Sequence, residues 1–171
     1  MNVYKLTVIA LLSAVAVVGR IAFKDLPGFQ PVTSLIIICG YFLGPIAAAI
    51  LAVLTTFLSN MTLGLGIWTL AQIVAWACIG VTSGLIGKVH WKKPLIVLTI
   101  FAVLSGYVFG LFMSIPNYLI AGKFFPYYLV GIPHDTNHAI GNGIFMVVLF
   151  PVLSRILIKY QKNWKKPRNT N

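Results

Sequence analysis

The chain alternates between long apolar runs and short stretches that contain glycine, proline or charged residues. Six apolar runs can be separated in this way, and each has the length and composition of a helix. Their approximate bounds are residues 3–23, 33–43, 45–59, 67–87, 94–121 and 136–160. The pattern predicts an all-α integral membrane protein with six transmembrane helices.

The second and third runs are separated only by Gly44 and Pro45. At about 1.5 Å of rise per residue, neither run reaches comfortably across a hydrocarbon layer of roughly 30 Å. They could form one long kinked helix or two short helices joined by a tight turn. The Gly-Pro pair and the combined length favour two helices. Loops are expected over residues 60–66 and 121–133, which contain glycine or proline.

The composition places the chain among membrane proteins. Hydrophobic residues make up 59% of the 171 residues and charged residues only 9%, which is more apolar surface than a soluble core needs. The length leaves no room for a separate soluble module. We therefore expect a single six-helix membrane domain over residues 1–171, in which residues 161–171 form a basic cytoplasmic tail.

Basic residues are unevenly divided between the two sides of the predicted bundle. With six spans and a cytoplasmic N-terminus, the inner side carries Lys5, Lys88, Lys92, Lys93, Arg155, Lys159, Lys162, Lys165, Lys166 and Arg168. The outer side carries Arg20, Lys24 and Lys123. Because cytoplasmic loops are enriched in Lys and Arg, both termini are expected in the cytoplasm. The expected location is a cell membrane, namely the bacterial cytoplasmic membrane.

The net charge of +11 is explained by these positions beside the apolar runs. No basic patch is interleaved with exposed aromatic residues, so a lipid bilayer and not a nucleic acid is the expected surrounding.

Asp135, one of only two acidic residues, precedes the last apolar run. In a helix, Asp135, His138 and Asn142 share one face, because they are three and four residues apart. Asp135 could cap that helix with its carboxylate, and Thr136 or Asn137 could do so instead. His138 and Asn142 could bind neighbouring helices or a polar ligand. The start of the stripe at the outer surface favours the ligand.

His134, Asp135 and His138 could also hold a metal ion or serve a small lipid-modifying membrane enzyme. No fourth ligand, second acid or HExxH spacing accompanies them, so no metal is expected. The sequence also lacks a Walker sequence, a nucleophile elbow and a pair of deep carboxylates, which disfavours an enzyme or a proton pump. A membrane assembly protein without a ligand remains an alternative.

The fourth apolar run places Trp68, Gln72 and Trp76 on one helix face. Trp68 fits an interfacial aromatic belt, but the deeper amide of Gln72 needs a partner from another helix or from a ligand. We favour a ligand role for Trp68 and Gln72 and a packing role for Trp76. Further candidates at the outer ends, each of which could be an ordinary loop or cap residue, are Gln30, Thr33, Asn60, Asn117 and Tyr118.

The first apolar run contains Ala10, Ser13 and Ala14. The Ala-x-x-x-Ala spacing permits close approach of another helix, although such pairs also occur by chance. These three residues are the candidate docking face for a partner.

Four stretches together resemble a known family. They are Gly19-Arg20-Ile21 with Gln30-Pro31-Val32-Thr33, Ser59-Asn60 with Leu63-Gly64-Leu65-Gly66-Ile67-Trp68-Thr69, residues 72–80, and Pro133-His134-Asp135 with His138-Ala139-Ile140-Gly141-Asn142. Together with the six predicted helices and a length of about 170 residues, these stretches resemble the substrate-binding S components of energy-coupling factor (ECF) vitamin transporters.

The resemblance implies a subunit that binds a vitamin on the extracellular side, is not an enzyme and binds no cofactor of its own. The implied partners are two cytoplasmic ATPase subunits, which use ATP, and a transmembrane coupling protein that docks on the first helix. The stretch Gly64-x-Gly66-x-Trp68-Thr69-x-x-Gln72 is most similar to cobalamin-type members, although Ile67 stands where many of them have proline. Pantothenate or another small vitamin or precursor is the alternative ligand.

Overall fold

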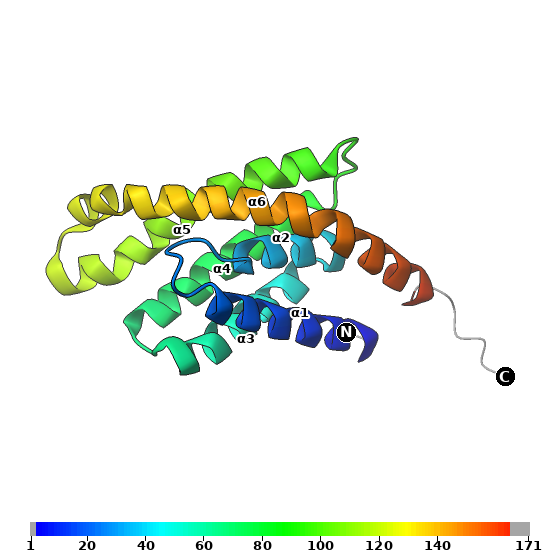
Figure 1. Ribbon diagram of the computed structural model, residues 1–171, viewed down its shortest axis with the longest axis horizontal. Helices are drawn as coiled ribbons and strands as arrows, with labels where there is room; N and C mark the ends of the chain where they lie inside the picture. The colour runs from blue at the N-terminus through cyan, green and yellow to red at the C-terminus, as the bar shows by residue number, and fades with distance from the viewer. Residues whose placement is uncertain (1–2, 165–171) are drawn as a thin grey trace.

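The structure, a computed structural model, describes residues 3–164 and contains six α-helices and no strand within that range. The helices are α1 (Val3–Ala22), α2 (Val32–Leu43), α3 (Pro45–Leu63), α4 (Ile67–Ile86), α5 (Pro94–Ala121) and α6 (Phe124–Trp164). The α1–α2, α3–α4 and α5–α6 connections lie at one end of the bundle, which we call the loop end (Figure 1). The start of α1 and the end of α6 lie at the opposite end.

The short helix α2 forms the centre of the bundle. It contacts each of the other five helices, and all residues from 31 to 40 are buried. A helix that is apolar on all sides is expected in such a position. Between membrane helices this burial stabilises mainly through close packing, because lipid tails are as apolar as the side chains.

Helices α2 and α4 pack closely where they cross. A Cβ atom added at Gly40 would overlap the Gly80 carbonyl oxygen and would lie 3.1 Å from the Gly84 nitrogen. Only small residues let two helix backbones approach this closely. Beside this contact, Ser83 Oγ donates to the carbonyl oxygen of Ile37 at 2.6 Å. The crossing therefore fixes the depth of α2 against its neighbour.

Gly44 and Pro45 separate α2 from α3 as the sequence pattern predicts. Gly44 has a φ of 90°, which favours glycine. Pro45 is the first residue of α3, where its missing N–H leaves no intrahelical hydrogen bond unmade. The two runs are therefore separate helices and not one kinked helix.

Helix α3 is longer than predicted. It continues to Leu63 instead of ending near residue 59, so Asn60 lies in its last turn and not in a loop. The expected loop is reduced to residues 64–66, and it begins at Gly64, which has a φ of 108°.

Helix α6 begins at Phe124 instead of near residue 136, so most of the loop expected over residues 121–133 is helical. Only Gly122, in the left-handed conformation, and Lys123 separate it from α5. Pro126 is tolerated because it lies in the first turn. Pro133 lies inside the helix, which nevertheless continues along α5, its most extensive packing partner. Packing against α5 thus overrides the local effect of this proline.

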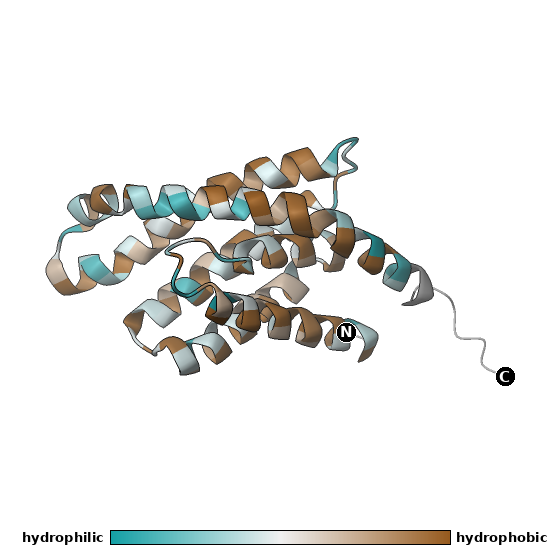
Figure 2. Ribbon diagram, in the orientation of Figure 1, coloured by the Kyte–Doolittle hydropathy of each residue, from teal (hydrophilic) through white to brown (hydrophobic). Residues whose placement is uncertain are grey.

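Five helices, all except α2, are long and apolar enough to cross a membrane within the described residues. Helix α2 has 12 residues, a length of about 18 Å. Hydrophobic residues occupy much of the length of every helix (Figure 2), and the side chains of Leu11, Val15 and Val18 on α1 are at least half exposed. The chain is therefore a multi-pass membrane protein. The predicted tail begins inside α6, and residues 165–171 lie outside the described residues.

Candidate functional site

A cluster of buried polar side chains lies inside the bundle near the loop end, and Arg20 in the last turn of α1 belongs to it. Arg20 Nη1 donates to Ser59 Oγ at 2.6 Å and to Asn60 Oδ1 at 2.7 Å. Within the described residues, no carboxylate lies in ion-pair range of Arg20. Neutral groups alone therefore solvate this guanidinium. Arg20 is only 6% exposed, so its guanidinium lies inside the bundle near the loop end.

Asn60 joins α3 to α4. Its Nδ2 donates to Thr69 Oγ1 at 2.9 Å and to Gln72 Oε1 at 2.8 Å, while its Oδ1 accepts from Arg20. Thr69 Oγ1 also accepts from the backbone N–H of Gly66 at 3.2 Å, at the start of α4. The buried amide of Gln72 thus finds its partner on a neighbouring helix.

Thr33 joins α2 to α4 and α6. Trp76 Nε1 donates to Thr33 Oγ1 at 3.0 Å, and the same oxygen lies 3.1 Å from His138 Nε2. All three side chains are buried. This hydroxyl is therefore the link between the indole of α4 and the imidazole of α6.

Aromatic rings connect the Arg20 group with the Thr33 group. The Arg20 guanidinium carbon lies 5.1 Å from the Trp76 ring centroid, within the range of a cation–π contact. Phe109 of α5 contacts Trp76 at 4.8 Å between centroids and His138 edge-on at 4.9 Å. The polar cluster thus continues without interruption from α1 to α6.

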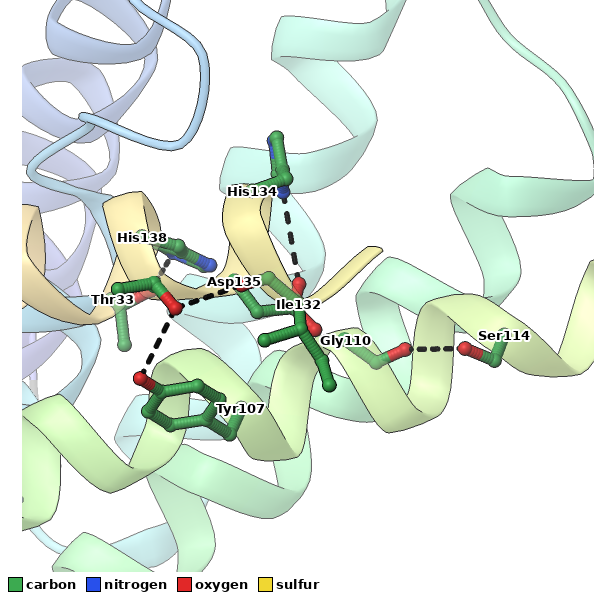
Figure 3. A network of polar contacts seen from close by, with 9 residues as sticks. Thr33, Tyr107, Gly110, Ser114, Ile132, His134, Asp135 and His138 are labelled. Atoms are coloured by element: carbon green, nitrogen blue, oxygen red, sulfur yellow. Dashed lines mark hydrogen bonds and ion pairs between the residues drawn. The ribbon is translucent and has the colours of Figure 1, made fainter. Parts of the chain in front are cut away.

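Asp135 (Figure 3) is not a helix cap, because α6 begins at Phe124, about three turns before it. Thr136 and Asn137 are inside the helix for the same reason, so neither caps it. The Asp135 carboxylate is only 4% exposed. Its Oδ1 lies 3.7 Å from Nδ1 of the half-exposed His134. Within the described residues, no group of three His, Cys, Asp or Glu side chains is arranged to hold a metal ion.

Gly110 of α5 provides the space for this carboxylate. A Cβ atom at Gly110 would overlap both oxygens and the Cγ atom of Asp135. One turn further along α5, Ser114 Oγ donates to the Gly110 carbonyl oxygen at 2.9 Å (Figure 3). The glycine therefore lets the buried carboxylate lie directly against the α5 backbone.

Asn142 lies one turn beyond His138 and is fully buried. Its side-chain Nδ2 donates to the Ala102 carbonyl oxygen of α5 at 3.2 Å, and its backbone carbonyl oxygen accepts from Ser34 Oγ of α2 at 2.8 Å. The first bond holds the side-chain amide against α5, and the Oδ1 of that amide has no partner within the described residues.

Four side chains of the cluster carry a buried polar atom with no hydrogen-bond partner within the described residues. These atoms are Arg20 Nε, Asp135 Oδ2, His138 Nδ1 and Asn142 Oδ1. Two buried hydroxyl oxygens, Ser13 Oγ and Thr55 Oγ1, also have no hydrogen-bond partner within the described residues. Each unsatisfied group costs about 1–3 kcal/mol. Concentrated in one part of the bundle, they make the cluster the candidate ligand site.

An open depression of about 330 Å³ lies between the α1–α2 connection and α6. Its lining residues are Leu26, Pro27, Phe29, Asn137 and Ile140. This depression is mainly apolar and lies beside the helix that carries Asp135 and His138.

Some predicted ligand residues lie apart from the cluster. Trp68 is 44% exposed and covers Gly66 at the start of its own helix. Gln30 is half-buried in the α1–α2 connection, and Tyr118 is exposed. Asn117 donates to a carbonyl oxygen of its own helix at 3.4 Å. Of the predicted set, the structure brings together Thr33, Asn60, Gln72, Asp135, His138 and Asn142.

The predicted docking residues divide between two faces of α1. Ala10 and Ala14 are exposed on the surface of the bundle. Ser13 is 2% exposed and faces the interior, so it does not share the outward face.

Sequence reasoning missed Arg20, Ser59 and Thr69 and gave Trp76 only a packing role. The available signals were a cation in the last turn of an apolar helix and the position of Trp76 on the same face as Gln72.

The chain matches no curated protein and no solved structure. A model of the family described as ECF transporter, substrate-specific component, matches residues 4–160. Members of this family are transporter subunits that associate with a transmembrane component and ATPase components of an ECF module. Because the match extends over nearly the whole six-helix bundle, the chain belongs to the family of ECF transporter substrate-specific components.

Proposed function

We propose that this chain is the high-affinity vitamin-binding subunit of an ATP-driven importer and that the vitamin binds in the buried polar cluster at the loop end. Family membership supplies the transport role. The observation that supports the location is the group of unpartnered atoms on Arg20, Asp135, His138 and Asn142. A polar ligand would provide the hydrogen bonds that the protein itself does not make.

The loop end faces the extracellular side in this proposal, and both termini face the cytoplasm of a bacterial cell. The distribution of basic residues supports this orientation, because Lys5, Lys88, Lys92, Lys93, Arg155 and Lys159 lie toward the end opposite the loop end. The ligand would then enter from outside the cell, as uptake requires.

Cobalamin is the proposed vitamin. The stretch that resembles cobalamin-type members contains Thr69 and Gln72, and both side chains hold Asn60 in the cluster. Thr69 and Gln72 therefore help to shape the proposed site, although Trp68 of the same stretch lies outside the site. Amide and hydroxyl side chains such as these can form hydrogen bonds with the many side-chain amides of a corrinoid.

The partners in this proposal are a transmembrane coupling protein and two cytoplasmic ATPase subunits. Ala10 and Ala14 are exposed and one turn apart on α1, which suits close contact with another membrane helix. The chain would bind the vitamin, and the ATPase subunits would supply the energy for its release inside the cell.

Uptake by the assembled transporter tests this function. The chain is purified with its coupling and ATPase subunits, reconstituted in proteoliposomes and supplied with labelled cyanocobalamin and ATP. We expect ATP-dependent uptake. An assembled complex that hydrolyses ATP but accumulates neither cyanocobalamin nor another water-soluble vitamin contradicts the proposal.

A further inference from the structure

The hydrogen bonds of Thr33 favour one tautomer of His138. An indole N–H can only donate, so the bond from Trp76 uses a lone pair of Thr33 Oγ1 and leaves its hydrogen available. His138 Nε2 is the one acceptor near that hydrogen within the described residues. If Thr33 donates to Nε2, the neutral imidazole carries its proton on Nδ1. The unpartnered Nδ1 is then an N–H donor.

The unpartnered atoms on α6 form an ordered pattern. Asp135 Oδ2 and Asn142 Oδ1 are acceptors, and the Nδ1–H of His138 lies between them in sequence. At about 100° and 1.5 Å per residue, the three Cα positions lie within about 60° around the helix axis. Their axial separations are about 4.5 Å and 6 Å. One helix face thus presents an acceptor, a donor and an acceptor in turn.

The unpartnered oxygens on this face decide which ligand group fits it. Asp135 Oδ2 and Asn142 Oδ1 are carboxyl and amide oxygens with no donor within the described residues. A ligand carboxylate placed beside them would add further oxygens and bring no donor, so the site disfavours it.

We propose that Asp135, His138 and Asn142 form a carboxamide-binding subsite. The His138 Nδ1–H donates to the carbonyl oxygen of a ligand amide, and Asp135 Oδ2 or Asn142 Oδ1 accepts from an amide N–H. This inference rests on the proposed function, since it specifies which chemical group of the vitamin the site recognises. An amide fits because its donor and acceptor are on separate atoms and can bridge two neighbours along the helix. An amine lacks the acceptor, and a carboxylate lacks the donor.

Two matched pairs of ligands test the chemistry on the purified full chain. Cyanocobalamin is compared with its monocarboxylic acids, in which one side-chain amide is a carboxylate. Pantothenate is compared with pantothenol, in which an alcohol replaces the carboxylate and the amide is kept. Dissociation constants are measured by titration calorimetry.

If cyanocobalamin is the vitamin, at least one acid is expected to bind about tenfold or more weakly, because its carboxylate leaves Asp135 or Asn142 without a donor. If pantothenate is the vitamin, pantothenol is expected to bind within about threefold of it, because the amide is unchanged. Equal binding of cyanocobalamin and all its acids, or a loss of about tenfold for pantothenol, overturns the subsite.

Asp135→Asn tests the acceptor at the first position. The new amide can donate, so the variant is expected to bind cyanocobalamin about tenfold more weakly than wild type and to bind one of the acids more tightly than wild type does. The matched control is Asp25→Asn, since Asp25 is the other acidic residue and is exposed on the α1–α2 connection. The control is expected to change neither affinity. A variant that loses both ligands equally contradicts an amide bound at Asp135.

His138→Gln and His138→Leu test the donor independently of Asp135. A glutamine can accept from Thr33 with its oxygen and still offer an N–H to the ligand, whereas leucine offers neither. We expect His138→Gln to bind the vitamin about tenfold more tightly than His138→Leu. Equal affinities overturn the donor role. Failure of the proposed function has a different signature, because then no vitamin binds to the chain or is transported by the assembled complex.

Discussion

Gly110 and Gly131 are two glycines that face the same carboxylate from different distances. A Cβ atom at Gly110 of α5 would overlap the Asp135 carboxylate, whereas a Cβ atom at Gly131 of α6 would lie 4.0 Å from Asp135 Oδ2. We therefore expect Gly110→Ala to destabilise the folded chain and Gly131→Ala to leave it unchanged or more stable.

The magnitudes of two opposing effects decide the outcome. Replacing a helical glycine by alanine stabilises a helix by about 0.5–1 kcal/mol, and both glycines lie inside helices. Overpacking a well-filled interior costs about 1–3 kcal/mol, and this cost applies only at Gly110. The net loss of unfolding free energy for Gly110→Ala should be at most about 2.5 kcal/mol, and the two variants should differ by the packing cost of about 1–3 kcal/mol. For a chain of this size, that difference corresponds to a Tm for Gly110→Ala that is about 2–12 °C below the Tm of Gly131→Ala.

Thermal unfolding of the purified chain in detergent measures both variants against wild type. The combination of Gly110→Ala with Asp135→Ala separates the overlap from other effects of the alanine. Removing the carboxylate should remove most of the penalty of Gly110→Ala, so the two changes should not be additive. A Gly110→Ala variant as stable as Gly131→Ala, or additive losses in the double variant, would refute the close approach of Asp135 to the α5 backbone.

Three further predictions concern the rest of the cluster and the docking face. Thr33→Val removes the hydroxyl shared by the Trp76 indole and the His138 imidazole. The variant should lower Tm by several degrees, since each polar group left without a partner costs about 1–3 kcal/mol. The control Thr7→Val, on the exposed face of α1, should have no effect on Tm. Arg20→Lys keeps the charge but not the forked geometry, so vitamin affinity measured by calorimetry should fall about tenfold, and an unchanged affinity would exclude Arg20 from the site. Ala10→Leu with Ala14→Leu should abolish ATP-dependent uptake but not vitamin binding, and normal uptake would exclude this docking face.

The positions of most helices follow from the sequence because glycine and proline stand between the apolar runs. The start of α2 and the ends of α1, α4 and α5 lie within a residue of the predicted positions. The start of α6 was wrong by about three turns, because Pro126 and Pro133 were interpreted as loop residues. The cost of a proline depends on its position in the helix and on packing against α5, and neither is visible in a local pattern.

The polar stripe on the last helix was predictable because helical spacing places Asp135, His138 and Asn142 on one face. Their depth was not, since it depends on where α6 begins. Arg20 lies in a stretch that resembles the family and was counted among the outer basic residues, but it was not predicted as a site residue, because its partners are about 40 residues away in the chain. Such contacts depend on the packing of α1 against α3, which spacing along one helix cannot indicate.

The burial of α2 on all sides has a consequence for the depth of the site. A helix that faces lipid must match the thickness of the hydrocarbon layer, but α2 is enclosed by the other five helices and is not subject to this requirement. It can therefore begin below the loop-end tips of its neighbours, as the short central ribbon shows (Figure 1). The first turn of α2 carries Thr33 and Ser34 at this lower level. The shortness of one shielded helix thus allows polar groups to lie at a level where the outward faces of the surrounding helices are apolar.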